Sequence, residues 1–155
     1  MKQRFYFDTS VFGGVFDEEF EEFTLPLFER LINNEFILLF STITQEELKN
    51  APSKVCELVV NLKTKNTIFL DLVEEAIELA NQYIFEKVVG QTSYTDCLHI
   101  ALATINHADY LISWNFKHIV NVQRIRGYNS INIKNGYKQL EIRSPRDLMI
   151  YEDNN

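Results

Sequence analysis

Short apolar runs alternate along the chain with longer segments in which apolar residues recur every three or four positions. The short runs end at polar or turn-forming residues, as strands do. They lie at residues 5–7, 36–40, 67–70 and 110–113. The run at 36–40 is apolar throughout, which is expected of a parallel strand covered on both faces. A weaker fifth strand is predicted at either 130–133 or 139–142.

The periodic segments predict helices between these strands. A continuous apolar stripe marks residues 23–32, 72–84 and 94–105. Thr44-Gln-Glu-Glu47 fits a capping box that opens a short helix, which Pro52 interrupts. A second short helix is expected through 55–62 and another at 117–126, whereas Phe12-Gly-Gly-Val15 is predicted to be a loop.

Strands that alternate with helices of this length predict one α/β domain. Its central, mostly parallel sheet should carry helices on both faces. The domain is expected to cover residues 1–150, with a C-terminal tail at 151–155. A chain of 155 residues is long enough for a hydrophobic core of its own, and no linker divides it.

Composition excludes several classes of protein. Apolar residues make up 46% of the chain and charged residues 24%, which is close to the globular average and excludes a disordered protein. The apolar runs are far shorter than the roughly 20 residues of a transmembrane helix, and the charged N-terminus lacks the apolar stretch of a signal peptide. Cys56 and Cys97 form no disulfide or zinc pattern. We therefore expect a cytoplasmic protein with no membrane contact.

Charge is distributed unevenly along the chain, whose formal net charge is −7. Residues 1–116 hold 8 basic and 18 acidic residues, whereas residues 117–146 hold 7 basic residues and one acidic residue. A basic segment beside an acidic body could face a phosphate backbone, so Lys117, Arg124 and Arg126 are candidate substrate-binding residues. The alternative is a solvated surface helix and loop.

Polar residues occur where a parallel sheet would bring them to one edge. Asp8 ends the first predicted strand, Glu47 lies in the segment after the second, and Asn115 follows the fourth. Asp96 lies in the first turns of the helix before the fourth strand. Ligands of open parallel sheets bind beyond the carboxyl ends of the strands. Three carboxylates there would repel one another without a cation, and Mg²⁺ prefers oxygen ligands, so a divalent-cation site is predicted.

Each of these residues also has a purely structural interpretation. Asp8 could cap a turn or a helix, and Glu47 could complete the capping box. Asp96 could be a charge at a helix start favoured by the helix dipole, and Asn115 could cap the segment that follows it. His99 could reach the face that Asp96 occupies, although a lone histidine in an apolar helix is more often a hydrogen-bonded core residue.

Four short motifs follow one another across residues 1–120. They are Phe5-Tyr-Phe-Asp-Thr-Ser-Val11, Ser41-Thr-Ile-Thr-Gln-Glu-Glu-Leu48, Asp96-Cys-Leu-His-Ile-Ala-Leu-Ala103 and Leu111-Ile-Ser-Trp-Asn-Phe116. Their order and spacing resemble the PIN-domain family, and look most like its VapC-type ribonuclease toxins and their relatives. The resemblance implies a single three-layer α/β/α fold with a central parallel sheet.

The resemblance also implies an activity and a set of site residues. By this resemblance, the protein is expected to be a metal-dependent endoribonuclease whose acidic residues bind Mg²⁺ or Mn²⁺. Asp8 matches the first acid and Asp96 the third, while Glu47 matches the second better than Glu46 does. Asn115 departs from the pattern, because the family commonly has Asp there. The expected partners are an RNA substrate, a small antitoxin protein and, in a homodimer, a second copy of the chain.

Two functions from different classes follow from these residues. In the first, Asp8, Glu47 and Asp96 bind the cation, while Asn115 and Ser10 orient water or phosphate during cleavage of single-stranded or looped RNA. In the second, the uncharged Asn115 leaves a weakened metal site on a protein-interaction module without nuclease activity. A phosphoryl-transfer domain of the receiver or haloacid-dehalogenase type is disfavoured, because residue 10 is Ser and its second acid is missing.

Overall fold

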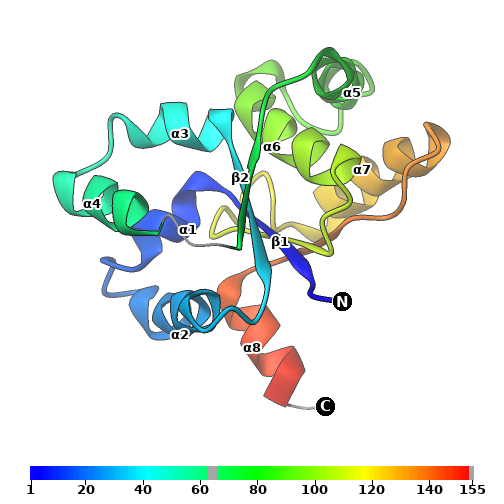
Figure 1. Cartoon of the computed structure of the whole chain (residues 1–155). Coiled ribbons are helices and arrows are strands. Elements are labelled where there is room, and N and C mark those ends of the chain that lie inside the picture. The colour runs from blue at the N-terminus through cyan, green and yellow to red at the C-terminus, as the bar shows by residue number, and fades with distance from the viewer. Residues whose placement is uncertain (63–65, 154–155) are drawn as a thin grey trace.

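A parallel sheet runs through the centre of the protein (Figure 1). The structure is a computed structural model that describes residues 1–62 and 66–153. In chain order its elements are β1 (Arg4–Phe7), α1 (Thr9–Gly14), α2 (Glu21–Ile32), β2 (Ile37–Ser41), α3 (Thr42–Leu48), α4 (Ser53–Asn61), β3 (Thr67–Leu70), α5 (Glu74–Phe85), the 3-10 helix η1 (Gln91–Ser93), α6 (Tyr94–Ile105), β4 (Tyr110–Ile112), α7 (Val122–Lys134), β5 (Glu141–Arg143) and α8 (Pro145–Asp153). These strands form a five-stranded, all-parallel sheet in the order β3-β2-β1-β4-β5. Of the helices in the described ranges, none has the length and apolar character needed to cross a bilayer.

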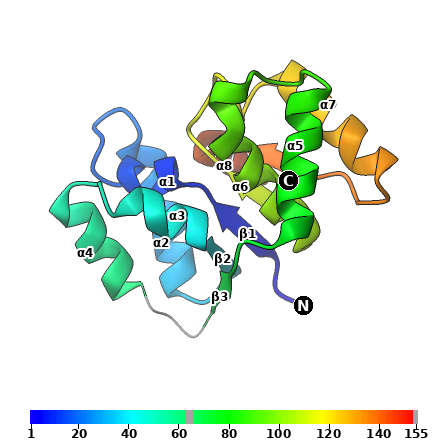
Figure 2. The ribbon, with the colours of Figure 1, turned by 90° about the horizontal axis from the view of Figure 1, so that it is seen from above.

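Alternate side chains of β1, β2 and β4 enter two separate hydrophobic cores. Phe5 and Phe7 of β1 belong to the core shared with α1, α2, α4 and α8, whereas Tyr6 belongs to the core shared with α5, α6 and α7. Seen from above, α1 to α4 lie on one side of the sheet and α5 to α7 on the other (Figure 2). The predicted three-layer α/β/α fold is therefore confirmed.

Aromatic contacts fix α1 and α2 against the end of β1. The ring of Phe7 meets Phe12 of α1 at 5.9 Å and Phe28 of α2 at 5.5 Å between centroids, both edge to face. Pairs in this geometry contribute about 0.5–1.5 kcal/mol beyond the area that they bury. Because Asp8 lies between Phe7 and α1, this packing also fixes the position of its carboxyl group.

The loop predicted at 12–15 is wrong, because helix α1 continues to Gly14. Val11 and Phe12 face the core and are buried, so the hydrophobic contacts of α1 hold it in place despite its glycines. Gly14 allows a close approach: a Cβ atom there would lie 2.7 Å from Nε1 of Trp114. A local pattern of two glycines could not reveal that distant partner.

Polar side chains set where two helices begin. The Ser41 hydroxyl accepts a hydrogen bond from the backbone N–H of Thr44 at 3.2 Å, so Ser41 is the N-cap of α3 and the capping box expected at Thr44 is wrong. Asn121 caps α7 in the same way, with its Oδ1 accepting from the backbone N–H of Arg124 at 3.2 Å. This helix therefore starts later than the predicted 117–126.

The C-terminal part of the chain departs most from the sequence pattern. Residues 130–133 belong to α7, so the first of the two positions predicted for the fifth strand is wrong, and β5 overlaps the second position at 139–142. Helix α8 was not predicted. It begins at Pro145, whose fixed φ suits the first turn of a helix, and it continues to Asp153.

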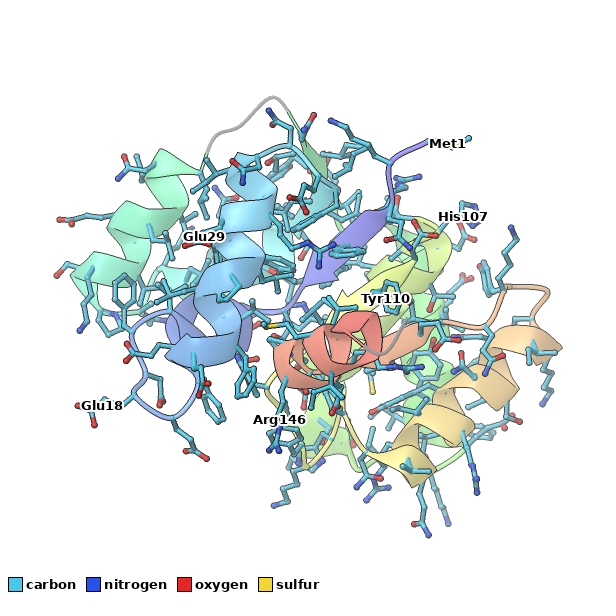
Figure 3. The ribbon with its side chains drawn as sticks, turned by 90° about the horizontal axis from the view of Figure 1, so that it is seen from below. Met1, Glu18, Glu29, His107, Tyr110 and Arg146 are labelled. Carbon is cyan, nitrogen blue, oxygen red and sulfur yellow. The ribbon has the colours of Figure 1, made fainter. Side chains whose placement is uncertain are left out.

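The carboxyl ends of neighbouring strands bring distant residues together. Phe7 of β1 pairs with Ile112 of β4, which pairs with Arg143 of β5. The residues that follow these strands therefore lie side by side at one edge of the sheet. In Figure 3, Met1 and His107, which precede strands, lie toward the opposite end of the view from Arg146, which follows β5.

Candidate active site

Asp8 is a buried carboxylate that two hydroxyl groups hold in place. Its Oδ1 accepts a hydrogen bond from Ser10 Oγ at 2.6 Å and its Oδ2 accepts one from Ser113 Oγ at 2.6 Å. Burial raises the pKa of Asp8 above its ordinary value, and the negative charge of Asp96 raises it further. His99 and the two hydroxyls offset part of this effect. A buried carboxylate in this situation gains from a nearby cation.

Glu47, near the end of α3, points toward α6. Its Oε1 accepts hydrogen bonds from Thr9 Oγ1 at 2.7 Å and from His99 Nε2 at 2.5 Å. Burial alone would raise the pKa of Glu47, but the hydrogen bond and charge of His99, together with Thr9, lower it overall. Glu46 instead pairs with Lys49 at 2.7 Å on the exposed face of the helix. The geometry therefore places Glu47, and not Glu46, at the site.

Asp96 lies in the first turn of α6 and completes the group of carboxyl groups. Burial raises its pKa, the charge of Glu47 adds to this effect, and His99 and His118 oppose it. The charge of Asp96 also contributes to the raised pKa of Asp8, after the larger effect of burial. The charge of Asp96 thus affects Asp8 at the end of β1, and the charge of Glu47 in α3 affects Asp96, whereas their convergence on one cation stays a prediction.

His99 connects this group to the core of the protein. The residue is 2% exposed, and its Nε2 donates to Glu47, because a carboxylate can only accept. Its Nδ1 lies 2.6 Å from the hydroxyl of Tyr6, and that hydroxyl also lies 2.7 Å from Ser41 Oγ. The expected hydrogen-bonded core histidine is confirmed, but its role at Glu47 was missed. The available signal was its spacing of three residues from Asp96 on one helix.

Asn115 caps the turn that follows β4. Its Oδ1 accepts hydrogen bonds from the backbone N–H groups of Lys117 at 3.2 Å and His118 at 3.0 Å. Its Nδ2 consequently faces Asp96, 3.5 Å from Oδ1 of that residue. The carbonyl oxygen that a cation would use is thus engaged by the backbone, and the capping interpretation is confirmed.

His118 is a further member of the site that sequence reasoning did not assign. Its charge lowers the pKa of Asp96. Its carbonyl oxygen accepts from the Tyr128 hydroxyl at 2.7 Å, which ties the loop to α7. Its Nδ1 is buried and has no hydrogen-bond partner among the residues that the structure describes. The sequence signal was only its position a few residues after β4.

Ser10, a candidate substrate-binding residue, belongs to the framework of the site. Its hydroxyl donates to Asp8 and accepts from the backbone N–H of Trp114 at 2.9 Å. The same hydroxyl therefore links the end of β1 to the loop after β4. Its first role in this geometry is to orient the Asp8 carboxylate.

The three basic candidates occupy different environments. Lys117 and Arg126 are exposed. The guanidinium of Arg124 donates to the carbonyl oxygen of Val88, so it holds α7 against the segment between α5 and α6. Arg124 is therefore a structural residue of the fold in this geometry, while the other two remain accessible to a ligand.

The carboxyl groups match a divalent cation in their chemistry. Oxygen donors suit Mg²⁺ and Mn²⁺, and the raised pKa values of Asp8 and Asp96 show that added positive charge would be favourable. Within residues 1–62 and 66–153, however, no three or more Asp, Glu, His or Cys side chains are gathered as a ready metal site. Their oxygens instead accept bonds from hydroxyls and from His99, and each oxygen keeps further lone pairs. The donor set fits the cation, and the metal site stays a prediction.

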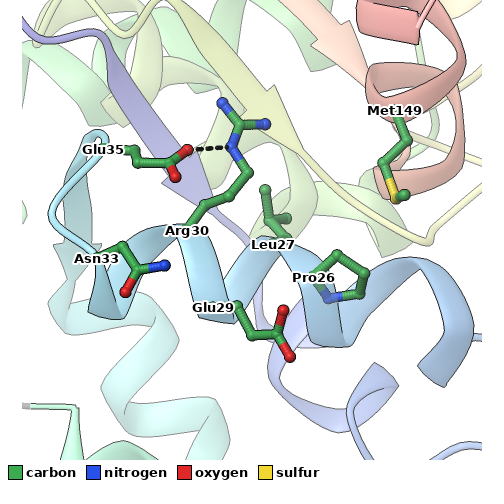
Figure 4. Close-up of a pocket in the computed structure, with 7 residues that line it drawn as sticks. All are labelled: Pro26, Leu27, Glu29, Arg30, Asn33, Glu35 and Met149. Carbon is green, nitrogen blue, oxygen red and sulfur yellow. Dashed lines mark hydrogen bonds and ion pairs between the residues drawn. The ribbon is translucent and has the colours of Figure 1, made fainter.

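A cavity of about 260 Å³ lies elsewhere, between α2 and α8 (Figure 4). Arg30 and Glu35 form an ion pair in its wall, with 2.9 Å between Nε and Oε2, and Met149 lines it from α8. None of the candidate catalytic residues lines this cavity. We therefore give it no part in the chemistry.

Comparison with known proteins supports the fold. No family model and no curated protein matches the sequence. The crystal structure of VapBC2 from Rickettsia felis bound to a DNA fragment from their promoter is similar with a TM-score of 0.53 and 13% identity, over 92% of this chain and 98% of that chain. The crystal structure of FitAcB from Neisseria gonorrhoeae is similar with a TM-score of 0.57 and 14% identity, over 91% of this chain and 97% of that chain. The chain thus shares its fold with chains of both structures over nearly their whole length.

Proposed function

We propose that the chain is a Mg²⁺- or Mn²⁺-dependent endoribonuclease of the PIN class. The observation that carries the proposal is that the end of β1 and the loop after β4 contact all three carboxylates: Ser113 bonds to Asp8, Thr9 bonds to Glu47, and the Asn115 amide faces Asp96. A hard cation would relieve both the cost of burying these charges and their mutual repulsion. The fold shared with VapBC2 and FitAcB agrees with the four motifs of the sequence.

The residues divide the work between ligand binding and positioning. Asp8, Glu47 and Asp96 would hold the cation, which would lower the pKa of the attacking water and neutralise charge on the phosphate. Ser10 and Ser113 fix both oxygens of Asp8 through hydroxyl hydrogen bonds. Groups that are already oriented need little reorganisation when the substrate arrives, which favours the reaction.

Single-stranded or looped RNA is the substrate class that we propose. Unpaired RNA exposes its phosphates and the faces of its bases, so it can approach a site at the edge of a sheet. The acidic body of the protein repels a polyanion, so the exposed cations of Lys117 and Arg126 would provide local attraction.

We also propose that a small antitoxin protein controls the activity in the cytoplasm. Similarity to VapBC2, which was solved bound to a DNA fragment from their promoter, supports a partner of this kind. A second copy of the chain is the other partner that we expect. Co-expression with the product of a neighbouring small gene tests the antitoxin, because a complex that blocks RNA cleavage is the expected result.

A protein-interaction module without nuclease activity is the second candidate function. Asn115 favours it, because its amide adds no negative charge and its Oδ1 caps the turn after β4. The lack of a ready metal cluster in the described part of the chain favours it as well. Retention of the three acids opposes it.

Cleavage of an end-labelled single-stranded RNA in Mg²⁺, Mn²⁺ or EDTA tests the nuclease proposal. We expect cleavage with either cation, none in EDTA, and none by Asp96→Asn, which keeps the size of the side chain. Asp71→Asn is the matched control, because Asp71 is an exposed carboxylate after β3. A folded wild-type protein that neither binds Mg²⁺ in calorimetry nor cleaves RNA would support the interaction module instead.

A further inference from the structure

A series of aromatic rings leads from the start of α2 to the loop beside the carboxylates. Phe20 stacks on Trp114, with 4.2 Å between ring centroids and 21° between planes. Trp114 in turn meets Phe116 at 6.0 Å in an edge-on arrangement. Trp114 is only 7% exposed, whereas Phe116 is 50% exposed. The outermost ring of the series therefore presents much of its surface to solvent.

Hydrogen bonds hold this series rigidly next to the candidate active site. The indole N–H of Trp114 donates to Thr24 Oγ1 of α2 at 2.9 Å, and its backbone N–H donates to Ser10 Oγ at 2.9 Å. The same Ser10 hydroxyl donates to Asp8. Asn115 separates Trp114 from Phe116, and its side-chain amide faces the Asp96 carboxylate at the start of α6. Phe116 thus follows two residues that are held next to the carboxylates, and its own ring contacts Trp114.

Exposed cations lie on the loop after β4 and at the start of α8, which packs against α2. Lys117 directly follows Phe116 and is exposed. Arg146, also exposed, lies at the start of α8 (Figure 3). Its guanidinium is 5.8 Å from the ring centre of Phe23 of α2. Backbone pairing of Ser113 with β5 brings this start of α8 to the end of β4. RNA is a polyanion that also carries flat rings, so cations beside an exposed ring suit it, although the formal net charge of the chain is −7.

We propose that Phe116 is a stacking subsite for one unpaired base of single-stranded RNA, with Lys117 and Arg146 contacting the adjoining phosphates. This inference rests on the proposed function and names the part of the substrate that the loop after β4 would recognise. A base in a duplex is already stacked on both faces, so this subsite selects unpaired over double-stranded RNA. Sequence preference at the subsite should be weak, because every base has a face that can stack.

The single tryptophan of the chain reports on the subsite without metal and without cleavage. An oligouridylate is unpaired, and its titration in EDTA should change the fluorescence of Trp114. The base would stack on Phe116, whose ring contacts the indole. Phe116→Ala and Phe116→Leu should each weaken binding about tenfold, a size expected for loss of one base–aromatic stack. Phe116→Tyr keeps the ring and should bind like the wild type. Phe69→Ala is the matched control, because Phe69 is 49% exposed and lies on the edge strand β3.

Salt dependence separates stacking from phosphate contacts. Phe116→Leu should leave the slope of log affinity against log salt unchanged, because stacking releases no counterions. Lys117→Gln and Arg146→Gln should each reduce the magnitude of the slope by about 0.7. Double-stranded RNA should bind the wild type and the Phe116 variants alike.

The outcomes distinguish the subsite from the nuclease proposal. Equal oligouridylate affinity of the wild type, Phe116→Ala and Phe116→Leu overturns the subsite, and if the wild type still cleaves RNA with Mg²⁺, only the subsite fails. If the tryptophan fluorescence changes and the Phe116→Ala and Phe116→Leu variants bind about tenfold more weakly, but no cation-dependent cleavage occurs, the subsite is retained and the nuclease proposal is overturned. Full binding by Phe116→Leu with loss in Phe116→Ala also overturns stacking, because it indicates general apolar packing of the kind that a docking protein uses.

Discussion

The Nε2 atom of His99 lies 2.5 Å from Oε1 of Glu47 and orients that carboxylate from inside the core. The side chain of His99 is 3% exposed and that of Glu47 is 39% exposed, so a buried residue of α6 positions a partly exposed acid of α3. The Tyr6 hydroxyl holds the other ring nitrogen at 2.6 Å. Residues that orient a metal ligand in this way influence metal affinity without touching the metal.

Replacement of His99 by alanine should reduce RNA cleavage and Mg²⁺ affinity about 10- to 100-fold, the usual size for loss of a residue that orients a ligand. His99→Gln, which keeps an N–H donor, should lose less. Cleavage rates over a range of Mg²⁺ concentrations measure the effect, because high Mg²⁺ restores a weakened ligand but does not restore an unfolded protein. His107→Gln is the control, since His107 is an exposed histidine that precedes β4 and lies away from the site. A normal Mg²⁺ dependence in both His99 variants would show that Glu47 needs no support.

Asp8→Asn should stabilise the metal-free protein while abolishing cleavage. Burial raises the pKa of Asp8, so at neutral pH the fold holds a charge that its surroundings disfavour. Asparagine can still bond to the hydroxyls of Ser10 and Ser113 and carries no charge. Removal of that charge should therefore raise the Tm of the metal-free protein. Thermal unfolding in EDTA measures this, and a Tm below that of the Asp71→Asn control would contradict it.

Stability and metal affinity should change with pH in opposite directions. The pKa values of Asp8 and Asp96 are raised above the ordinary 3.8, so the folded protein retains protons that the unfolded chain has lost. The stability of the metal-free protein should fall as the pH rises from about 4 through the raised values. Mg²⁺ affinity should rise over the same interval, because the cation competes with those protons. The lowered pKa of Glu47 keeps it ionised throughout. Urea unfolding and calorimetry in one series of buffers would detect parallel changes, which would contradict this account.

The sequence was sufficient where the local pattern and the tertiary role agree. The apolar run at 36–40 and the periodic segment at 94–105 are buried for the reasons that their patterns indicate, and both elements form. The placement of Asp8 after β1 and of Asn115 after β4 at one edge was equally accessible, because parallel strands must present their carboxyl ends at one edge.

Other features depend on contacts that no local pattern carries. Helix α1 contains two glycines and resembles a loop, but Gly14 serves the packing of Trp114, which is remote in sequence. The amide orientation of Asn115 follows from backbone N–H groups that only the turn after β4 presents together. Charge alone suggested Arg124 as an RNA ligand, whereas its bond to Val88 could be seen only in the folded chain.

Arg124→Gln should reduce stability and leave RNA affinity unchanged. Its guanidinium donates to the carbonyl oxygen of Val88 and joins α7 to the segment after α5. A hydrogen bond from a charged group contributes about 1.5–3 kcal/mol, and because Arg124 is only partly buried we expect a loss of about 1 kcal/mol. Arg126→Gln removes the same charge from an exposed position of the same helix and should leave stability unchanged. Equal urea midpoints for the two variants would contradict a structural role for Arg124.

Asn115→Asp should raise the affinity for the cation and lower the stability of the metal-free protein. One carboxylate oxygen can still cap the turn after β4, and the other would lie where Nδ2 now faces Asp96 at 3.5 Å. Hard cations gain from ligand charge, and one unit of opposite charge at about 4 Å is worth about 4 kcal/mol at an effective dielectric of 20. Repulsion within the enlarged group of carboxylates cancels much of this, so we expect about tenfold higher affinity, or about 1.4 kcal/mol.

Without the cation, the Asn115→Asp variant replaces a favourable N–H···O contact to Asp96 with a repulsion between two carboxylates, and it should therefore unfold at a lower temperature in EDTA. Calorimetric titration of Mg²⁺ and Mn²⁺ into both proteins, with thermal unfolding in parallel, measures both effects. Asn115→Ala separates the cap from the charge, because it loses the cap without adding a carboxylate. Equal cation affinities of the wild type and Asn115→Asp would place residue 115 outside the metal site and limit it to capping. A rise in affinity accompanied by faster RNA cleavage would show that the natural asparagine holds the activity below what this fold can reach.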